Sequence, residues 1–426
     1  MLLTRTPQLT AQHSVLHSLR FELAFVIACG VVLPFALLAN FSVGNAALQQ
    51  GPLNSFVAGG LGAVGLVLIL RRLRVYPGMA VVRSILPVLG VIYGVSLAMF
   101  TLLRLDYSNR LLLACFVCTL VARYALATLR HRAPQRIHWI VPGGRVDIIY
   151  DLPSMAALPL WLPTVPEIAG SALIADLHAD HSPEWERLLA EAAISGKPVY
   201  HYKQVWEAET GKVQIEHLSE NSFGALVPSL TYQKLKRAVD LMCCLLVFPG
   251  VVLLMLVTAV LIKLDGPGPV FFLQRRMGFR GRVFQVFKFR TMTVVNDGEH
   301  REASITQAGD QRITRIGHFL RRTRLDELPQ IINIIRGEMS WIGPRPEAVS
   351  LSSWYEMEIP FYRYRHIVRP GITGWAQVNQ GHVASLEEID DKLQYDFFYI
   401  KNLSYWLDIL IVFRTMRVVL SGFGAK

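Results

Sequence analysis

Long apolar stretches, separated by short basic or polar segments, dominate the first third of the chain. They run from about Leu23 to Asn40, from Gly51 to Leu70, from Ser84 to Leu103 and from Leu111 to Leu129. A helix needs roughly 20 apolar residues to cross a bilayer, and all four stretches are close to that length. The pattern therefore predicts a membrane protein with a four-helix transmembrane bundle over residues 1–130.

Arg123 is the one charged residue within these four stretches. It lies near an end of the fourth stretch, where a long side chain can extend to the lipid headgroups. A functional charge inside the membrane is the alternative, and the position favours the headgroup interpretation. Because the stretches are otherwise almost free of polar groups suited to a substrate path, the pattern gives little support to a transporter.

The charges of the connecting loops predict the orientation of the bundle. Residues 40–55 carry no charge, whereas four arginines lie between residues 71 and 83, and the segment that follows the fourth stretch is also basic. Positively charged loops of membrane proteins face the cytoplasm. Both ends of the bundle, and the chain that follows it, are therefore expected on the cytoplasmic side.

A fifth apolar run, Leu241 to Ile262, differs from the others because Pro249 and Gly250 lie at its middle. Proline removes a backbone hydrogen bond and kinks a helix. If this run crossed the membrane, a large domain without cysteine would follow it on the opposite side. A helix that breaks, enters one leaflet and returns keeps both flanks in the cytoplasm, and the pattern modestly favours this re-entrant form.

The composition of residues 131–228 is typical of a soluble domain. Short apolar runs at 137–141, 146–150, 172–177 and 198–201 predict strands, and 184–193 predicts a helix. This alternation indicates a small α/β domain, Rossmann-like, with a parallel sheet. We expect it to be regulatory or to serve in assembly.

Two features of this middle domain are candidate ligand sites. The sequence around Gly143-Gly144 does not match the dinucleotide-binding fingerprint, so no nucleotide is assigned to it. His178 and His181 are three residues apart and have no third ligand near them in the sequence. They are therefore expected to be surface or loop residues.

The composition agrees with a membrane protein that also has soluble parts. Of the 426 residues, 52% are hydrophobic and 18% are charged, against about 25% charged in soluble domains. The net charge of +11 favours anionic partners. Nucleic acid fits poorly, because the chain has no recognition motif and its basic segments adjoin an apolar run. All five cysteines lie in apolar runs, so no disulfide framework is expected.

Basic segments follow the fifth run and surround a pair of carboxylates. Seven Lys or Arg residues lie between 263 and 290, a second group lies between 312 and 324, and Asp326 and Glu327 come directly after it. Charge beside a membrane can simply attract anionic lipid, but interleaved Gly and Pro indicate close approach to a ligand. Cations that hold a diphosphate, with carboxylates that bind Mg²⁺ or attack phosphorus, are typical of phosphoryl transfer.

Ordered motifs occur from Tyr232 to the end of the chain. They are Lys236-Arg237…Asp240, Gly268-Pro-Val-Phe-Phe, Lys288-Phe-Arg-Thr-Met, Leu325-Asp-Glu-Leu-Pro-Gln, Gly337-Glu-Met-Ser, Gly343-Pro-Arg-Pro, Arg369-Pro-Gly-Ile-Thr-Gly-Trp-Ala-Gln-Val and Asp396…Tyr399…Asn402-Leu-Ser…Leu407-Asp408. Together they closely resemble the bacterial sugar transferase family, the monotopic phosphoglycosyl transferases that act on polyprenol phosphate. The resemblance implies a mostly α-helical catalytic domain over residues 229–426.

The resemblance also implies how this domain meets the membrane. The fifth run becomes the family's re-entrant helix, over about 236–263, which Lys236 and Arg237 anchor at the lipid surface and Pro249 breaks. The family usually has Ser before this proline, where this chain has Phe248, and a small residue at the position of Arg324. These departures concern the geometry of the break and the recognition of the substrate.

For the chemistry, the resemblance implies that Asp326 attacks the β-phosphate of a UDP-sugar and releases UMP. Undecaprenyl phosphate would then take the phosphosugar from the carboxylate. Glu327 would assist through Mg²⁺ or by handling protons, so Asp326 and Glu327 are the expected Mg²⁺ ligands. The expected phosphate and nucleotide contacts are Lys288, Arg290, Arg345 and Arg369.

The four helices and the middle domain are similar to the long subgroup of this family, which starts the synthesis of exopolysaccharide, capsule or O-antigen. This subgroup implies a multi-pass protein of the bacterial inner membrane, its catalytic domain on the cytoplasmic face, and a homodimer is a further expectation. Glucose or galactose 1-phosphate is the subgroup's common choice, and an N-acetylated sugar is the alternative. A catalytically inactive membrane scaffold is the other functional hypothesis, against which the intact Asp326-Glu327 pair argues.

Overall fold

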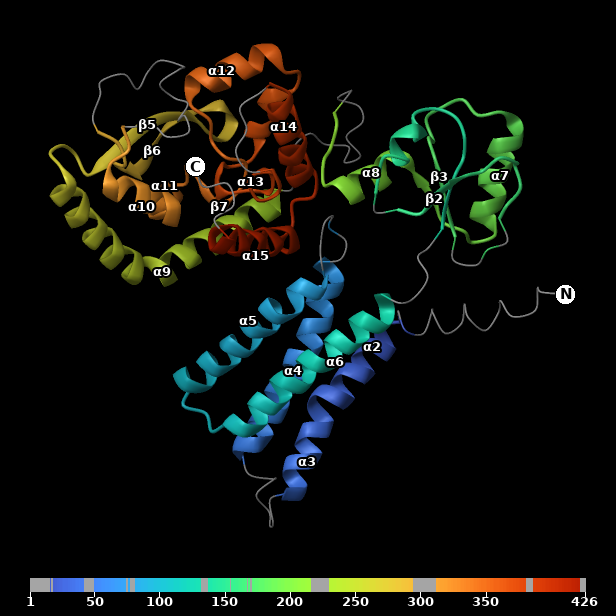
Figure 1. The fold of residues 1–426 in the computed structure, drawn as a ribbon, viewed down its shortest axis with the longest axis horizontal. Coiled ribbons are helices and arrows are strands. Elements are labelled where there is room, and N and C mark those ends of the chain that lie inside the picture. Colours follow the sequence, from blue (N-terminus) through green and yellow to red (C-terminus); the bar gives the residue numbers. More distant parts are fainter. Residues whose placement is uncertain are drawn as a thin grey trace. The chain divides into compact units, whose positions relative to one another are not determined.

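The computed structural model describes residues 16, 18–41, 50–73, 76, 81–131, 137–153, 155–166, 168, 171–215, 230–293, 312–380 and 386–421. The chain divides into two compact units, Met1–Gly211 and Lys212–Lys426 (Figure 1). The first unit contains a group of long apolar helices and a small α/β domain. The second unit contains a mostly helical domain with two small sheets.

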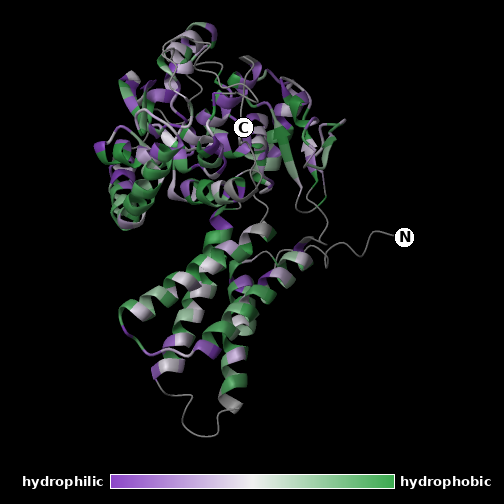
Figure 2. Cartoon of the chain, turned by 60° about the vertical axis from the view of Figure 1, so that its left-hand side comes forward, coloured by the Kyte–Doolittle hydropathy of each residue, from purple (hydrophilic) through white to green (hydrophobic). Residues whose placement is uncertain are grey.

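Long apolar helices form the N-terminal part of the first unit. They are α2 (Leu19–Ile27), the π-helical η1 (Ala28–Val32) and α3 (Leu33–Phe41), which follow one another directly, then α4 (Gln50–Leu73), α5 (Val81–Leu102) and α6 (Asn109–His131). Each of the four resulting segments is long and apolar enough to cross a membrane, and hydrophobic residues cover most of their length in Figure 2. Small residues allow close packing, because a side chain at Gly30 would meet Thr119.

A buried ionic cluster joins three of these helices. Glu22 on α2 is 1% exposed and accepts hydrogen bonds from Arg71 Nε at 2.7 Å and Arg130 Nη2 at 3.0 Å. It also pairs with Arg123, which is itself 1% exposed. The prediction that Arg123 extends to the headgroups is therefore wrong. The pattern missed its partner because Glu22 lies just before the apolar stretch predicted from Leu23, whereas the helix begins at Leu19.

The middle domain is a four-stranded parallel sheet with the order β2-β1-β3-β4. Its elements are β1 (His138–Ile140), the 3₁₀ turn η3 (Val146–Ile149), β2 (Ala157–Pro159), β3 (Ala172–Ala175), α7 (Pro183–Ile194), β4 (Val199–His201) and α8 (Tyr202–Thr210). Apolar residues of α7 pack with one face of the sheet, and those of η3 and α8 with the other. The predicted parallel α/β arrangement is therefore present.

One predicted strand of this domain, 146–150, is wrong. The segment is the 3₁₀ turn η3, in which Val146 and Ile149 are both buried. These residues are three apart, so one helical turn places both on the same face, whereas a strand would place them on opposite faces. Gly143 and Gly144, with φ of 120° and 67°, turn the chain immediately before this segment.

Among the residues that the structure describes from 230 onward, the second unit contains ten helical elements and four strands. The helical elements are α9 (Leu230–Asp265), η5 (Phe279–Gly281), α10 (Arg315–Thr323), η7 (Leu325–Gln330), α11 (Ile331–Arg336), α12 (Val349–Glu358), η8 (Tyr362–Ile367), α13 (Trp375–Asn379), and, with them, α14 (Leu386–Lys401) and α15 (Tyr405–Ser421). The strands are β5 (Phe271–Met277) paired antiparallel with β6 (Val283–Phe289), and β7 (Ser340–Ile342) paired parallel with β8 (Gly371–Thr373). This composition agrees with the predicted mostly α-helical domain.

Helix α9 is a continuous helix of 36 residues that contains Pro249. The prediction that the helix breaks at this proline is wrong, because the helix continues through it. The helix does change direction along its length in Figure 1. Its N-terminal half contributes Cys244 to a core with Ile331 and Ile334 of α11. Its C-terminal half contributes Ile262 to a second core. Both halves therefore pack on the same domain.

Candidate active site

The two predicted catalytic carboxylates lie on the short turn η7. Helix α10 ends at Arg324, whose φ of 60° and ψ of 16° are left-handed. The chain then turns into η7, which presents Asp326 and Glu327. For a residue with a side chain this conformation costs on the order of 1 kcal/mol. The residue that departs from the family pattern, Arg324, thus forms the junction that directs both carboxylates.

Glu327 is held by cations from two other elements. Its Oε1 accepts hydrogen bonds from Lys288 Nζ of β6 at 3.1 Å and from Arg345 Nη2 at 2.9 Å, and Arg324 Nη1 lies 4.0 Å from it. The side chain of Glu327 is only 8% exposed. The structure therefore brings together four of the predicted site residues, Asp326, Glu327, Lys288 and Arg345, although they lie on three separate segments of the sequence.

The charges of this cluster set the ionisation of its members. Burial opposes the charged form of Glu327, but the neighbouring Arg345, Lys288 and Arg324 outweigh it and hold the pKa of Glu327 below its ordinary value. Burial lowers the pKa of Lys288 to about 8, against the opposing attraction of Glu327. Mainly through Glu327, the pKa of Arg345 is raised. Glu327 and Arg345 thus form a stable ion pair, and the pKa of Lys288 lies closer to neutral pH than that of an ordinary lysine.

Asp326 differs from its neighbour because one of its oxygens is unused. Its Oδ1 is buried and has no hydrogen-bond partner among the described residues. Burial, and then the charge of Glu327, raise the pKa of Asp326, while Lys288 and Arg345 partly counter this shift. A buried oxygen without a partner costs free energy in the folded protein. Such a group is typical of a site that a substrate or ion completes.

The loop that carries Arg345 is fixed at four successive carbonyl groups. Gly371 N donates to Pro344 O at 2.9 Å, Arg365 Nη2 to Arg345 O at 3.0 Å and Met277 N to Glu347 O at 3.0 Å. The carbonyl between them, that of Pro346, accepts a bond from Arg276 Nη1. The backbone on both sides of Arg345 is therefore held in place, which pre-orients its guanidinium toward Glu327.

Arg365 is itself positioned by a buried carboxylate. It donates from Nε at 3.1 Å and from Nη2 at 2.7 Å to Oδ2 of Asp396 on α14, and both side chains are almost fully buried. The sequence assigned no role to this pair. Asp396 begins one of the quoted motifs and Arg365 lies four residues before another, but nothing in the sequence indicates that they meet, because they are 31 residues apart.

Strand β6, which carries Lys288, is attached to α11 by Asn333. Phe287 N donates to Asn333 Oδ1 at 3.1 Å, and Asn333 Nδ2 donates to Gln285 O at 2.7 Å and to Glu338 Oε2 at 2.7 Å. The side chain is completely buried. An amide is suited to this position because it donates and accepts at once. Asn333 thereby fixes the strand on which Lys288 lies.

Two predicted phosphate contacts lie elsewhere in the domain. The guanidinium of Arg290 donates to Pro267 O at 2.7 Å, Gly266 O at 2.8 Å and Ile262 O at 3.2 Å. It therefore binds carbonyl groups at and beyond the C-terminal end of α9. Arg369 donates to Gly337 O at 3.0 Å, and its guanidinium lies 5.0 Å from the centre of the Phe279 ring. The structure thus does not bring Arg290 or Arg369 into contact with Glu327.

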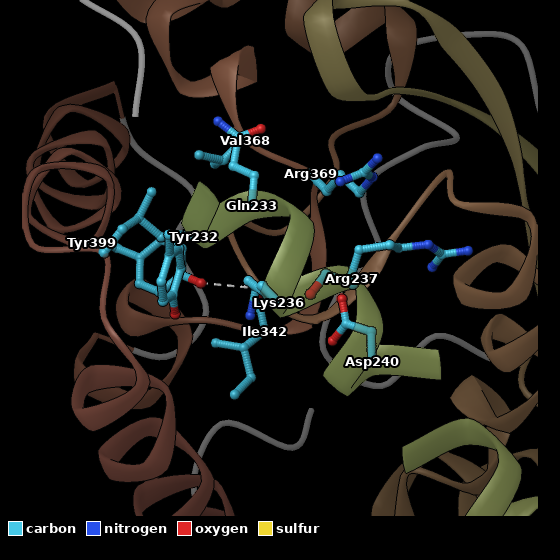
Figure 3. Close-up of a pocket in the computed structure, with 11 residues that line it drawn as sticks. Tyr232, Gln233, Lys236, Arg237, Asp240, Ile342, Val368, Arg369 and Tyr399 are labelled. Atoms are coloured by element: carbon cyan, nitrogen blue, oxygen red, sulfur yellow. Dashed lines mark hydrogen bonds between the residues drawn. The ribbon is translucent and has the colours of Figure 1, made fainter. Parts of the chain in front are cut away.

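The predicted membrane anchors on α9 contact the protein. Lys236 Nζ donates to Asp408 Oδ2 at 2.6 Å, and Arg237 Nη2 donates to Ile335 O at 2.9 Å. Both line a small cavity with Asp240 and Arg369, drawn in Figure 3. Neither Asp326 nor Glu327 lines this cavity. In the structure these side chains therefore attach the N-terminal half of α9 to the domain.

Comparison with known proteins identifies the family. The family model described as bacterial sugar transferase matches residues 231–422. A UDP-N-acetylgalactosamine-undecaprenyl-phosphate N-acetylgalactosaminephosphotransferase from Aeromonas hydrophila is 42% identical over 362 residues, which is 84% of this chain and 85% of that protein. The chain belongs to the bacterial sugar transferase family. The matched segment of this sugar transferase includes the four site residues that the structure brings together, which are Lys288, Asp326, Glu327 and Arg345.

Other relatives of this sugar transferase match a smaller part of it. UDP-glucose:undecaprenyl-phosphate glucose-1-phosphate transferases from Xanthomonas campestris pv. campestris and Escherichia coli (strain K12) are 48% and 44% identical over 189 and 196 residues. These matches cover 43% and 45% of this chain, and 38% and 41% of the two relatives. The predicted resemblance and the prediction of an enzyme are confirmed.

Proposed function

We propose that this sugar transferase moves a sugar 1-phosphate from a UDP-sugar to undecaprenyl phosphate and releases UMP. The observation that carries this proposal is the free, buried Oδ1 of Asp326 beside a carboxylate that Lys288 and Arg345 hold ionised. An unpaired carboxylate oxygen surrounded by cations is suited to attack a diphosphate. The names of the relatives support both the donor and the acceptor. This reaction would be the first membrane step in the synthesis of a surface polysaccharide.

The reaction proceeds in two displacements. A carboxylate oxygen of Asp326 attacks the β-phosphorus, the bond to the bridging oxygen breaks, and UMP leaves with that oxygen. A phosphate oxygen of undecaprenyl phosphate then attacks the same phosphorus, which frees Asp326 and forms the sugar diphosphate lipid. Lys288 and Arg345 stabilise the negative charge on the phosphate oxygens during both steps. Glu327 keeps these two cations in position.

The donor set of the site fits Mg²⁺. Asp326 Oδ1 is a hard oxygen ligand without a partner among the described residues, and Mg²⁺ in phosphate sites is bound through one or two carboxylates and the substrate. We therefore expect Asp326, with Glu327, to hold the ion. When bound, Mg²⁺ would neutralise charge on the diphosphate. Removal of Mg²⁺ by chelation is expected to stop UMP release, and its return to restore it.

The proposed place of the reaction is the surface of the inner membrane, on the cytoplasmic side. Support comes from α9, whose two halves pack on one domain while Leu245, Leu246 and Leu253 are 76%, 82% and 66% exposed. A helix that crossed the bilayer would place its ends about 30 Å apart on opposite sides. A re-entrant helix lets a lipid phosphate and a soluble nucleotide meet at the level of the headgroups.

The sugar is proposed from the relative that matches most of the chain. Because that protein is named for N-acetylgalactosamine, we propose an N-acetylated UDP-sugar as the donor, with UDP-glucose as the alternative that the other relatives favour. A homodimer through the N-terminal helices stays a prediction.

UMP release across a panel of UDP-sugars, with undecaprenyl phosphate as acceptor, tests the proposal. In Asp326→Asn, release should fall on the order of 10³-fold or more, because an amide is a poor nucleophile. Asp265→Asn, which neutralises a carboxylate at the end of α9, is the matched control and should keep the activity. Full activity of Asp326→Asn would reject Asp326 as the nucleophile. Absence of release from the wild-type protein with every UDP-sugar would favour the inactive scaffold.

A further inference from the structure

A second cluster of polar side chains lies in the middle domain, at the carboxyl edge of its parallel sheet. Asp176 directly follows β3, His201 is the last residue of β4, and His178 lies in the loop after Asp176. The carboxyl ends of neighbouring parallel strands meet at one edge, which is where open α/β sheets bind their ligands. No third ligand for His178 could be predicted from the sequence, because His201 approaches Asp176 and His178 only through the pairing of β3 with β4.

The three side chains converge on one point. One oxygen of Asp176 and one ring nitrogen of each histidine lie within 4.8 Å of one another. His178 Nδ1 lies 2.9 Å from His201 Nε2. At this distance one imidazole donates a hydrogen bond to the other, and a metal ion that replaces the shared proton would find both ring nitrogens facing the same point. Imidazole nitrogen with carboxylate oxygen is a usual ligand set for Zn²⁺.

The orientation of His201 agrees with that of a metal ligand. Its Nδ1 lies 3.4 Å from the carbonyl oxygen of Ala175. A carbonyl oxygen only accepts, so Nδ1 carries the proton and Nε2 keeps its lone pair toward His178. Metal-binding histidines almost always donate their second nitrogen to a carbonyl or carboxylate in this way.

Asp176 is also held in place by groups outside the cluster. Its Oδ2 accepts from Arg145 N at 3.1 Å and its Oδ1 from His178 N at 3.1 Å. The side chain is buried, and Gly144 packs so closely that a Cβ there would lie 2.3 Å from Oδ2. A carboxylate has about four lone-pair sites, so two hydrogen bonds leave capacity for a cation.

We propose that Asp176, His178 and His201 form a binding site for a divalent transition-metal ion of the Zn²⁺ class. Three protein ligands leave a fourth position for water or another ligand. The ion joins the ends of β3 and β4 to the loop after β1, which Asp176 already binds through Arg145 N. This site is separate from the carboxylates of the transferase domain and does not depend on the proposed reaction.

The test is a Co²⁺ titration of the full chain in detergent, purified through a tag without histidine. Co²⁺ replaces Zn²⁺ and gives visible absorption bands in sites with nitrogen and oxygen ligands. We expect one Co²⁺ per chain, displaced by Zn²⁺ and not by millimolar Mg²⁺. His178→Ala and His201→Ala should each weaken binding at least tenfold. His178 is exposed, so its loss should leave the fold intact, as an unchanged unfolding temperature would verify.

Two further variants separate this site from other positions. His318→Ala, an exposed histidine on α10, is the matched control and should bind Co²⁺ as the wild type does. Asp326→Asn should also keep the absorption bands. The proposal is overturned if the wild type binds no Co²⁺, if the His178 and His201 variants bind it unchanged, or if Asp326→Asn loses it.

Discussion

Arg365 donates a hydrogen bond from Nη2 to the carbonyl oxygen of Arg345 at 3.0 Å, while the same guanidinium is held by Asp396. One buried arginine thus connects helix α14 to the loop whose own arginine contacts Glu327. Arg365 does not contact the carboxylates, so its effect on the reaction passes through the position of Arg345. A displacement of about 1 Å at a catalytic group can cost on the order of 10²-fold in rate.

Arg365→Lys should therefore lower kcat about 10- to 100-fold and change KM for the UDP-sugar much less. Lysine keeps the charge beside Asp396 but lacks the planar fork that bonds Asp396 from both Nε and Nη2 and also reaches the carbonyl of Arg345. The test is a double-mutant cycle that combines Arg365→Lys with Arg345→Lys, in which the initial rate of UMP release is measured for each variant. If Arg365 acts through Arg345, its loss adds little in the Arg345→Lys background. Fully additive losses would mean that Arg365 serves stability alone.

The pH dependence of kcat/KM should be bell-shaped. Asp326 must be ionised to attack, and since its pKa is raised by burial and by Glu327, activity should be lost on acidification above the pH expected for an ordinary aspartate. Lys288 must be charged to bind phosphate, and its pKa is lowered to about 8. Activity should therefore fall as the pH rises through about 8, because kcat/KM reports the free enzyme.

Lys288→Arg tests which group sets the alkaline limb. A guanidinium stays protonated above pH 12, so the fall near pH 8 should disappear in this variant even if its maximal rate is lower. Rates measured from pH 5 to pH 10 with a fixed UDP-sugar would suffice. An unchanged alkaline limb would assign that limb to a residue other than Lys288.

Gly371 is a position where the backbone of the catalytic domain leaves no space for a side chain. A Cβ there would lie 2.1 Å from Gly343 N, and Gly371 N also bonds the carbonyl of Pro344. Gly371→Ala should therefore destabilise the domain by roughly 1–3 kcal/mol and displace the Arg345 loop, lowering activity. Gly266→Ala is the control, since nothing lies within 4 Å of that Cβ. Equal unfolding temperatures for the two variants would contradict this account.

The elements that the sequence predicted best are those in which local pattern decides the structure. The length of each apolar run is sufficient to predict α4, α5 and α6, and short runs of β-branched and apolar residues predict β1, β3 and β4. The strand predicted at 146–150 was wrong because two apolar residues three apart fit a helical turn as well as a strand. The break predicted at Pro249 was wrong for a different reason, since a kinked helix keeps most of its hydrogen bonds and needs no break.

The site was predicted as far as residue chemistry indicates it. Asp326 and Glu327 were noticed as carboxylates among arginines, and the family resemblance then implied their roles and those of Lys288 and Arg345. Arg290 could not be distinguished from Lys288 and Arg345 by sequence, because all three are cations. Only the structure shows that its guanidinium bonds carbonyl groups at the end of α9. The Arg365–Asp396 pair and the approach of His201 to Asp176 depend on tertiary pairing, which neither spacing nor composition specifies.

The ionic cluster of the N-terminal helices leads to the last prediction. Glu22 is completely surrounded by protein and pairs with Arg71, Arg123 and Arg130. Removing one partner of a buried ion pair leaves an uncompensated charge, at a cost of roughly 3–5 kcal/mol. Glu22→Gln should therefore lower the unfolding temperature of the protein in detergent. Asp106→Asn, which removes the same charge at an exposed position, should not.

In Glu22→Gln combined with Arg123→Met, fewer charges are left unpaired. The combined variant should therefore lose less stability than the sum of the losses in the two single variants. Additive losses, or a Glu22→Gln variant as stable as the wild type, would show that these arginines do not depend on Glu22.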